Sequence, residues 1–210
     1  LTAQRPRSAA VAAGACGETL IPGATYRLQL HKDFTFAQAA AIVPYLARLG
    51  ITHVYCSPIQ RARPGSTHGY DVIEPGVINP ELGGMDGFVA FTEALRAHGM
   101  GQLIDLVPNH MGVLGTDNPW WQDVLENGRA SAFAEYFDID WQPLDAQLAG
   151  KVLLPVLGSA YGDILANGEL VLHHVAAQGR LALHYHDHHF PLTPESYAPA
   201  LRAAELGVGD

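Results

Sequence analysis

Apolar and polar positions in the first half of the chain predict three strands and two helices. Residues 24–30 (ATYRLQL) alternate loosely, as in a half-buried strand. Residues 51–56 (ITHVYC) and 103–107 (LIDLV) are short and apolar, as in buried strands. Residues 35–49 and 86–98 have the length and end signals of helices. The order strand, helix, strand, helix, strand predicts a parallel sheet covered by helices, and so an α/β fold.

Particular residues mark the expected helix ends. Thr35 and Gln38 have the spacing of a capping box, in which the two side chains bind amides at the helix start. Gly50 is expected to end this helix, and Pro44 to remove one of its hydrogen bonds and kink it. Asp86 is expected to cap the second helix.

The remaining segments are a long loop and a region of different pattern. Residues 57–85 are rich in Pro and Gly, and a loop of this length is uncommon unless it is functional. Residues 118–127 predict a short helix. Antiparallel strands are expected at 151–157, 169–175 and 180–186, with turns at Asn167-Gly168 and Gln178-Gly179. We therefore expect a β-rich subdomain inserted after the third strand.

Composition narrows the class of protein. The chain has 210 residues, 48% of them hydrophobic and 16% charged, which is typical of a globular protein. A net charge of −9 argues against a nucleic-acid partner, because phosphate binding needs clustered Lys and Arg. No apolar run approaches the ~20 residues of a membrane-spanning helix. Cys16 and Cys56 are too few for a disulfide framework, which favours a reducing cytoplasm.

The first residues imitate a signal peptide only weakly. Arg5 and Arg7 precede an Ala-rich run, but the run lacks the Leu-rich character of a secretory signal. We expect residues 1–22 to be a disordered leader.

Two loop motifs carry groups suited to binding a sugar. In Ser66–Asp71 (STHGYD), His68, Tyr70 and Asp71 offer a donor, a flat apolar ring and a carboxylate. The alternative is a polar turn with a packed Tyr. The second motif, DLVPNH, places Asp105 at a strand end, followed by Asn109 and His110. It too has a structural alternative, in which Asp105 only holds the loop and His110 is satisfied in the core.

A concentration of histidines near the C-terminus raises the question of a zinc site. The six are His173, His174, His184, His186, His188 and His189. If residues 184, 186 and 188 alternated along one strand, they would share a face. No cysteine and no suitable acidic ligand accompany them, so a solvated strand face is the preferred interpretation and no metal is expected.

These motifs resemble the α-amylase clan. DLVPNH resembles the first conserved region of that clan, and HGYD resembles its preceding aromatic motif. Longer strings resemble the maltooligosyltrehalose synthase family: TYRLQL, YCSPI, RPGSTHGYDV, NPELGG, GMGQLIDLVPNHM, DNPWWQDVLENG and YFDIDW. They occur in order over residues 24–141, and LHYHDHHFPLTPESYA extends the likeness to Tyr197.

The resemblance implies a fold and an activity. The fold would be the first three βα units of a TIM (β/α)8 barrel over residues 23–117, followed by part of a β-rich subdomain over residues 118–210. Such a barrel needs roughly 250 residues to close. The activity would be an intramolecular transglycosylation that converts the reducing-end α-1,4 bond of a maltooligosaccharide to an α,α-1,1 bond.

The resemblance also implies roles for individual residues. Tyr70 would stack on a sugar ring, His110 would bind a hydroxyl of that ring, and Asp105 would be a structural carboxylate. His68 and Asp71 would line the site. Asn109 corresponds to a calcium ligand in many relatives, but the partner ligands are not identifiable here. We therefore expect neither metal nor cofactor.

The carboxylates that do the covalent chemistry in the clan follow the fourth and fifth strands, and no matching motif occurs in these 210 residues. The chain is therefore expected to bind a glucan substrate without reacting. Two alternatives stay open: another α-amylase-clan hydrolase or transferase, and a non-catalytic glucan-binding module.

Overall fold

The computed structural model describes residues 21–176 and 179–205. The leader expected over residues 1–22 lies outside these residues, apart from Ile21 and Pro22, which are exposed coil. None of the helices in the described part is long and apolar enough to span a membrane.

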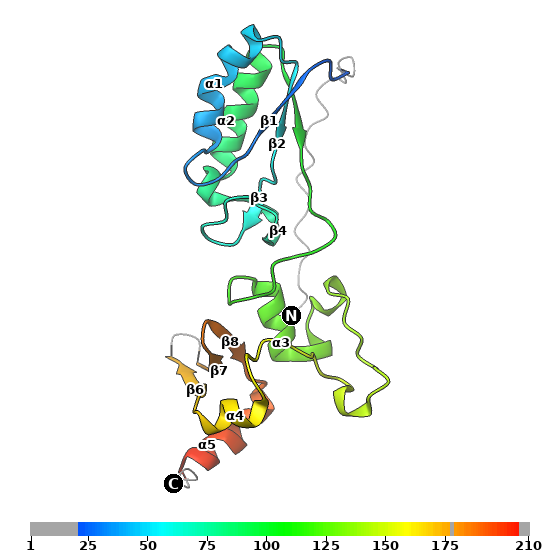
Figure 1. Cartoon of the computed structure of the whole chain (residues 1–210), viewed down its shortest axis with the longest axis vertical. Helices are drawn as coiled ribbons and strands as arrows, with labels where there is room; N and C mark the ends of the chain where they lie inside the picture. Colours follow the sequence, from blue (N-terminus) through cyan, green and yellow to red (C-terminus); the bar gives the residue numbers. More distant parts are fainter. Residues whose placement is uncertain (1–20, 177–178, 206–210) are drawn as a thin grey trace, which may run out of the picture.

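A three-stranded parallel sheet organises the first half of the chain. Its strands are β1 (Thr25–Leu28), β2 (His53–Cys56) and β5 (Gly101–Ile104), in the order β1-β2-β5. Helix α1 (Phe36–Arg48) connects β1 to β2, and α2 (Gly84–Ala97) precedes β5. Both helices lie on the same side of the sheet (Figure 1). The predicted parallel arrangement is confirmed.

The two faces of the sheet differ because side chains alternate along each strand. Val54 points to the helices and joins a core that includes Phe36. Arg27, Tyr55 and Leu103 are paired across the strands in one row, on the other face. No described helix covers that face, and Leu103 is 39% exposed.

The capping box and the end of the first helix are as expected. The Thr35 amide donates to Gln38 Oε1 at 3.0 Å, and the Ala37 amide donates to Thr35 Oγ1 at 3.3 Å. The helix continues through Pro44 to Arg48. Gly50 follows with φ +89°, a left-handed conformation that Gly adopts without steric cost.

The expected cap of the second helix is wrong. A short 3-10 turn, Pro80–Leu82, leads into the helix, and Gly83 takes the capping position with φ +107°. Asp86 lies within the first turn instead, where its charge is favourable to the helix dipole.

The segment expected to be a loop, residues 57–85, contains two strands. Strand β3 (Gln60–Ala62) pairs antiparallel with β4 (Val72–Ile78). Pro75 and Gly76 lie inside β4, and the register shifts twice along the pair. Such irregularities accommodate residues that a regular ladder excludes. Residues 63–71 between the strands do form a loop.

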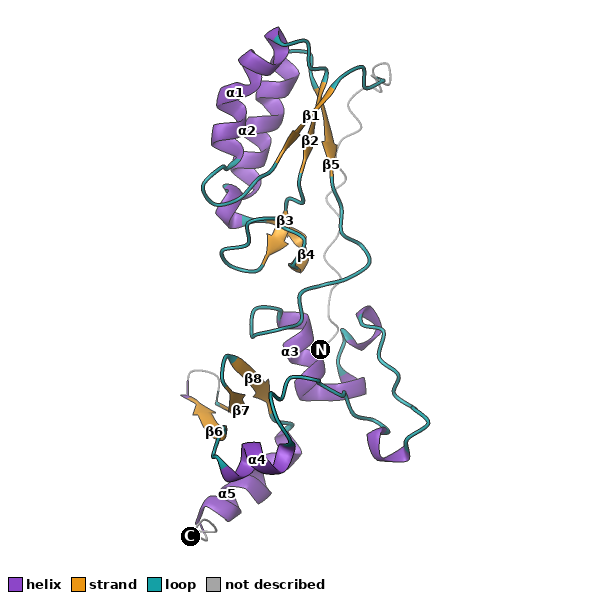
Figure 2. Cartoon of the chain, viewed as in Figure 1, coloured by secondary structure: helices purple, strands orange, loops and turns teal. Residues whose placement is uncertain are grey.

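The second half of the chain mixes helices and strands, so the β-rich expectation holds only for residues 170–191. An antiparallel sheet is formed by β6 (Leu170–Val175), β7 (Arg180–Tyr185) and β8 (His188–Pro191). The described helices are α3 (Pro119–Asn127), α4 (Tyr161–Ala166) and α5 (Tyr197–Glu205). Figure 2 shows α3 between the loop after β5 and the second sheet.

Several expectations for this half need correction. The predicted helix at 118–127 is confirmed as α3, capped by Asn118. Residues 151–157 form no strand, and Asn167-Gly168 follows the unexpected helix α4 instead of joining two strands. Strand β8 was not expected. In the turn predicted at Gln178-Gly179, Gln178 lies outside the described residues.

The histidines do not share one strand face. Strand β7 ends at Tyr185, and His186 lies in the turn with φ +48°. His184 instead stacks between His173 and His189, with ring centroids 4.0 and 3.7 Å away. Its Nε2 atom is buried without a hydrogen-bond partner in the described part. The same part contains no group of three His, Cys, Asp or Glu able to hold a metal ion.

We expect the histidine stack to make the second sheet sensitive to acid. Burial, and then the proximity of His189 and His173, lower the pKa of His184 below its usual ~6.5. The unfolded chain therefore binds the proton more readily than the folded chain. We expect stability to be complete above about pH 6.5 and to fall as the pH drops toward the lowered folded pKa.

Urea denaturation of wild-type chain and of His184→Phe at pH 8 and pH 5 will measure this effect. We expect the acid-induced loss to be smaller in His184→Phe. The matched control is His174→Phe, which replaces an exposed histidine on β6 and should keep the wild-type pH dependence. Equal acid sensitivity in wild type and His184→Phe would contradict the assignment.

Candidate functional site

Polar side chains gather where the three parallel strands end. Arg27 and Tyr55 are neighbours on the uncovered face of the sheet. Asp105 directly follows β5, and its amide donates to the Cys56 carbonyl at 3.2 Å, which extends the pairing by one residue. Tyr70 comes from the loop between β3 and β4. Ends of parallel strands are where α/β proteins place their sites.

The Asp105 carboxylate holds this group together. Its Oδ2 atom accepts hydrogen bonds from the Tyr70 hydroxyl at 2.6 Å and from the Tyr55 hydroxyl at 3.0 Å. Arg27 Nη1 lies 3.9 Å from the same oxygen. The carboxylate side chain is only 19% exposed. A half-buried carboxylate needs such partners, and here they fix two aromatic rings.

The charges and protons of the group follow from these contacts. The bond that Arg27 donates to Tyr70 at 3.3 Å is the main cause that raises the pKa of Arg27, so its guanidinium stays charged. The bond that Tyr55 donates to Asp105 raises the pKa of the Tyr55 phenol. Arg27 also lies over the Tyr55 ring, 5.0 Å from its centroid. Arg27 is therefore a cation beside the neutral phenol of Tyr55.

The loop that carries Tyr70 is fixed by a glycine and a glutamine. Gly69 is buried with φ +79°, and a Cβ at this position would lie 2.8 Å from the Pro58 carbonyl oxygen. Only Gly fits so close an approach in this conformation. Gln29 Nε2 donates to the carbonyls of Thr67 at 3.1 Å and His68 at 3.3 Å. The loop is therefore tied to the end of β1.

His68 and Asp71 take part in the same loop. The Tyr70 amide donates to His68 Nδ1 at 3.0 Å, and the two rings lie 6.1 Å apart, nearly parallel. Asp71 Oδ1 accepts from the Ser66 hydroxyl. Both side chains thus shape the turn around Tyr70.

His110 reaches the same loop from the segment after β5. Its Nε2 atom donates to the Tyr70 carbonyl at 2.9 Å. The ring is exposed, and its Nδ1 atom has no hydrogen bond within residues 21–176 and 179–205. In the neutral ring, Nδ1 is then an acceptor for a hydrogen bond donated by a hydroxyl group. Asn109 is adjacent and exposed.

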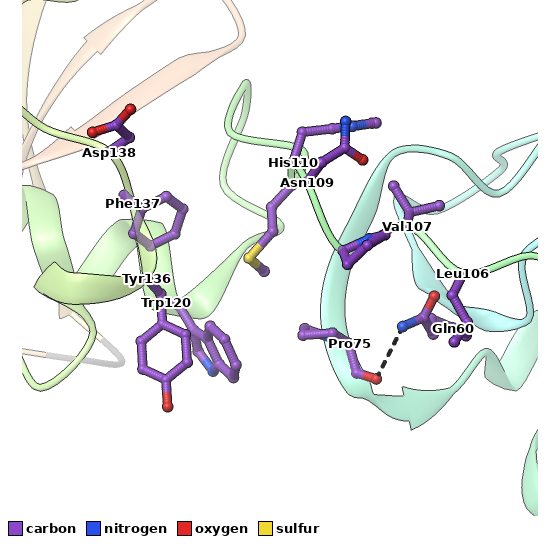
Figure 3. Close-up of a pocket in the computed structure, with 12 residues that line it drawn as sticks. Gln60, Pro75, Leu106, Val107, Asn109, His110, Trp120, Tyr136, Phe137 and Asp138 are labelled. Atoms are coloured by element: carbon purple, nitrogen blue, oxygen red, sulfur yellow. Dashed lines mark hydrogen bonds between the residues drawn. The ribbon is translucent and has the colours of Figure 1, made fainter.

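Beside His110 lies a cavity of about 430 Å³. Figure 3 shows Asn109 and His110 between two walls, one made of Gln60, Pro75, Leu106 and Val107, the other of Trp120, Tyr136, Phe137 and Asp138. The volume is within the ~300–1,000 Å³ of small-ligand sites.

The structure brings the expected site residues together. Tyr70, His68, Asp71, Asp105 and His110 form one connected group, and Asn109 lines the adjoining cavity. Arg27, Gln29 and Tyr55 also belong to the group and were not predicted from the sequence. Their signal was present, since Arg27 and Gln29 are polar residues alternating with leucines inside the predicted first strand. Because Asp105 is already bound by two hydroxyls, the group is suited to holding a ligand and not to attacking one.

Known proteins are similar to this chain in sequence. The family model described as the α-amylase catalytic domain matches residues 40–164. A putative maltooligosyl trehalose synthase from Mycobacterium tuberculosis is 47% identical over 162 residues, covering 70% of this chain. The chain spans 21% of the length of that relative.

Solved structures give the same picture. The maltooligosyltrehalose synthase from Arthrobacter ramosus is 40% identical and superimposes with a TM-score of 0.73, covering 83% of this chain and 22% of its own. A hypothetical maltooligosyl trehalose synthase from Sulfolobus tokodaii is 33% identical with a TM-score of 0.70, covering 89% of this chain and 24% of its own.

Proposed function

Because this chain belongs to the α-amylase catalytic-domain family, we propose that it is a segment of a maltooligosyltrehalose synthase. The full enzyme converts the reducing-end α-1,4 linkage of a maltooligosaccharide to an α,α-1,1 linkage. Support comes from relatives with that name and from the strings TYRLQL, NPELGG and DNPWWQDVLENG, which the shared chemistry of the clan does not demand.

The same proposal assigns the strands to positions in a barrel. Strands β1, β2 and β5 are the first three strands of a (β/α)8 barrel, within residues 23–117. The uncovered face of the sheet, with Arg27 and Tyr55, is the barrel interior, and residues 118–210 belong to an inserted subdomain. Along these strands, side chains alternate between the face covered by helices and the face that carries Arg27 and Tyr55. This alternation supports the assignment.

The chain supplies the binding half of the site. Tyr70 stacks on a glucosyl ring, and His110 Nδ1 accepts a hydrogen bond from a hydroxyl of that ring. Asp105 fixes the Tyr70 hydroxyl, while His68, Asp71 and Asn109 line the site. The observation that carries this proposal is the double anchoring of Tyr70, through its hydroxyl at 2.6 Å from Asp105 and through its carbonyl at 2.9 Å from His110. A tyrosine whose hydroxyl and backbone are both held presents a preorganised ring to a sugar.

The bond-breaking groups are not supplied by this chain. A retaining enzyme needs two carboxyl groups about 5–5.5 Å apart, one as nucleophile and one as acid. Asp105 is bound by two tyrosine hydroxyls, and the fourth- and fifth-strand motifs are absent from these 210 residues.

A cytoplasmic location stays a prediction from the cysteines, of which Cys56 is a buried free thiol.

Incubation with maltopentaose tests the proposal. We expect the full-length enzyme to remove the reducing end without accumulating glucose, and the 210-residue chain to give no turnover because it lacks both carboxylates. The measurements are reducing-sugar content and product chromatography. Turnover by highly purified 210-residue chain would contradict the assignment of roles. Net hydrolysis by the full-length enzyme would favour another member of the clan.

A further inference from the structure

An aromatic cluster on the second half of the chain faces the site. Trp120 lies on α3, and Phe133 and Tyr136 lie at the 3-10 turn Ala134–Tyr136. The Trp120 ring is stacked on Phe133 at 5.1 Å, and the Tyr136 ring is tilted against it at 4.7 Å. Tyr136 is nevertheless 64% exposed. The cluster is packed on its inner side and leaves a large ring surface open.

The open side of this cluster lines the cavity beside His110. Trp120 and Tyr136 form its wall opposite Pro75 and Leu106 (Figure 3). His110 lines the same cavity while its Nε2 atom holds the Tyr70 carbonyl. The cavity and the Tyr70 group therefore share His110, which lines the one and is hydrogen-bonded to the other.

The wall is fixed relative to that group. Asn118, 2% exposed, accepts from the Trp121 amide at 3.0 Å and donates from Nδ2 to the Gly112 carbonyl at 2.9 Å. The Gly112 amide in turn donates to the Val72 carbonyl of β4 at 2.7 Å. A chain of buried or backbone hydrogen bonds thus connects the start of α3 to the strand that follows the Tyr70 loop.

The lining selects a neutral, hydroxyl-rich ligand. The aromatic rings offer flat apolar surface, and Asn109, His110 and Asp138 are polar residues of the same lining. A pyranose presents a C–H face to the former and hydroxyls to the latter. Asp138 disfavours an anionic ligand. We propose that Trp120 and Tyr136 form a separate glucosyl subsite, next to the unit at Tyr70. This inference rests on the proposed function.

Binding of maltopentaose to the full-length enzyme, measured by calorimetry, tests the subsite. We expect Trp120→Ala and Tyr136→Ala each to raise Kd by about tenfold, because each removes one stacking ring. Tyr136→Phe keeps the ring and should bind within about twofold of wild type. Tyr136 is the more informative position, since its exposure makes a folding defect on substitution unexpected.

One further control and three contrary outcomes make the test decisive. Tyr161→Ala removes an equally exposed ring on α4, away from the cavity, and should not change Kd. Tyr136→Ala with unchanged Kd and a lowered melting temperature would mean that protein, not sugar, covers the ring, which overturns the inference. Wild-type conversion of maltopentaose together with unchanged Kd in both alanine variants overturns it while the proposed function stands. Absence of glucan binding by wild type would overturn both.

Discussion

Full-length enzyme carrying Tyr70→Ala will show kcat/KM for maltopentaose lowered by about ten- to a thousandfold, or about 1.4–4 kcal/mol of transition-state stabilisation. The change removes the ring that we propose to stack on the sugar, together with the hydroxyl that Asp105 holds at 2.6 Å. Binding at this position helps catalysis when it strengthens as the sugar ring flattens. Steady-state kinetics on folded enzyme is the measurement.

We expect His110→Ala to lower kcat/KM by a factor in the same range. The double mutant should lose less transition-state stabilisation than the two single losses added together, because we propose that both groups position one ring. Tyr70→Phe is the matched control, since it keeps the ring and deletes only the hydroxyl. We expect a smaller loss, about tenfold. Wild-type kcat/KM in folded Tyr70→Ala would end the stacking proposal, whereas a lowered melting temperature with normal kinetics would assign Tyr70 a structural role.

Asp105→Ala is expected to have the second large effect, on stability as well as activity. The change leaves the hydroxyls of Tyr55 and Tyr70 and the Arg27 guanidinium without their common acceptor. Removing one partner of a half-buried, hydrogen-bonded charge costs about 2–4 kcal/mol. Urea denaturation of the full-length enzyme will show the loss, and kcat/KM should fall because Tyr70 is no longer anchored.

The control for Asp105 is Asp33→Ala. The Asp33 carboxylate is 70% exposed and pairs with Lys32 at 3.1 Å, a contact of the kind that contributes little. We expect the Asp33→Ala variant to have the stability and the kcat/KM of the wild type. Asp105→Asn keeps the volume and one acceptor, so an intermediate loss is expected. Wild-type stability in Asp105→Ala would show that the tyrosines find other partners.

Local patterns were predictable because their physics is local. The capping box of Thr35 and Gln38 involves residues within one helical turn, and it was found as predicted. The parallel sheet followed from the order of short apolar strands. The proximity of Tyr70, Asp105 and His110 was predictable, because their motifs follow strands and groups at strand ends gather at one edge.

Other elements depend on contacts that a single segment does not reveal. Residues 151–157 (KVLLPVL) have the apolar content of a strand, but residues 152–156 line an apolar cavity with Trp121 and Phe190 instead of joining a ladder. In β4, Pro75 and Gly76 argued against a strand, and the register shifts that accommodate them come from its partner β3. Arg27 and Gln29 became site residues only through the loop that folds against them.

During synthesis, the helix-covered face of the sheet can be buried before any later part of the chain covers the other face. The main apolar core draws on residues 28–100 only, so it can collapse once that length has left the ribosome. At about 5–20 residues per second, the rest of a long barrel takes many seconds more to appear. For that time the strands β1 and β5 present open backbone edges beside the exposed Leu103. The uncovered face of the sheet, which we propose as the barrel interior, is therefore a surface at which we expect a nascent chain to need protection.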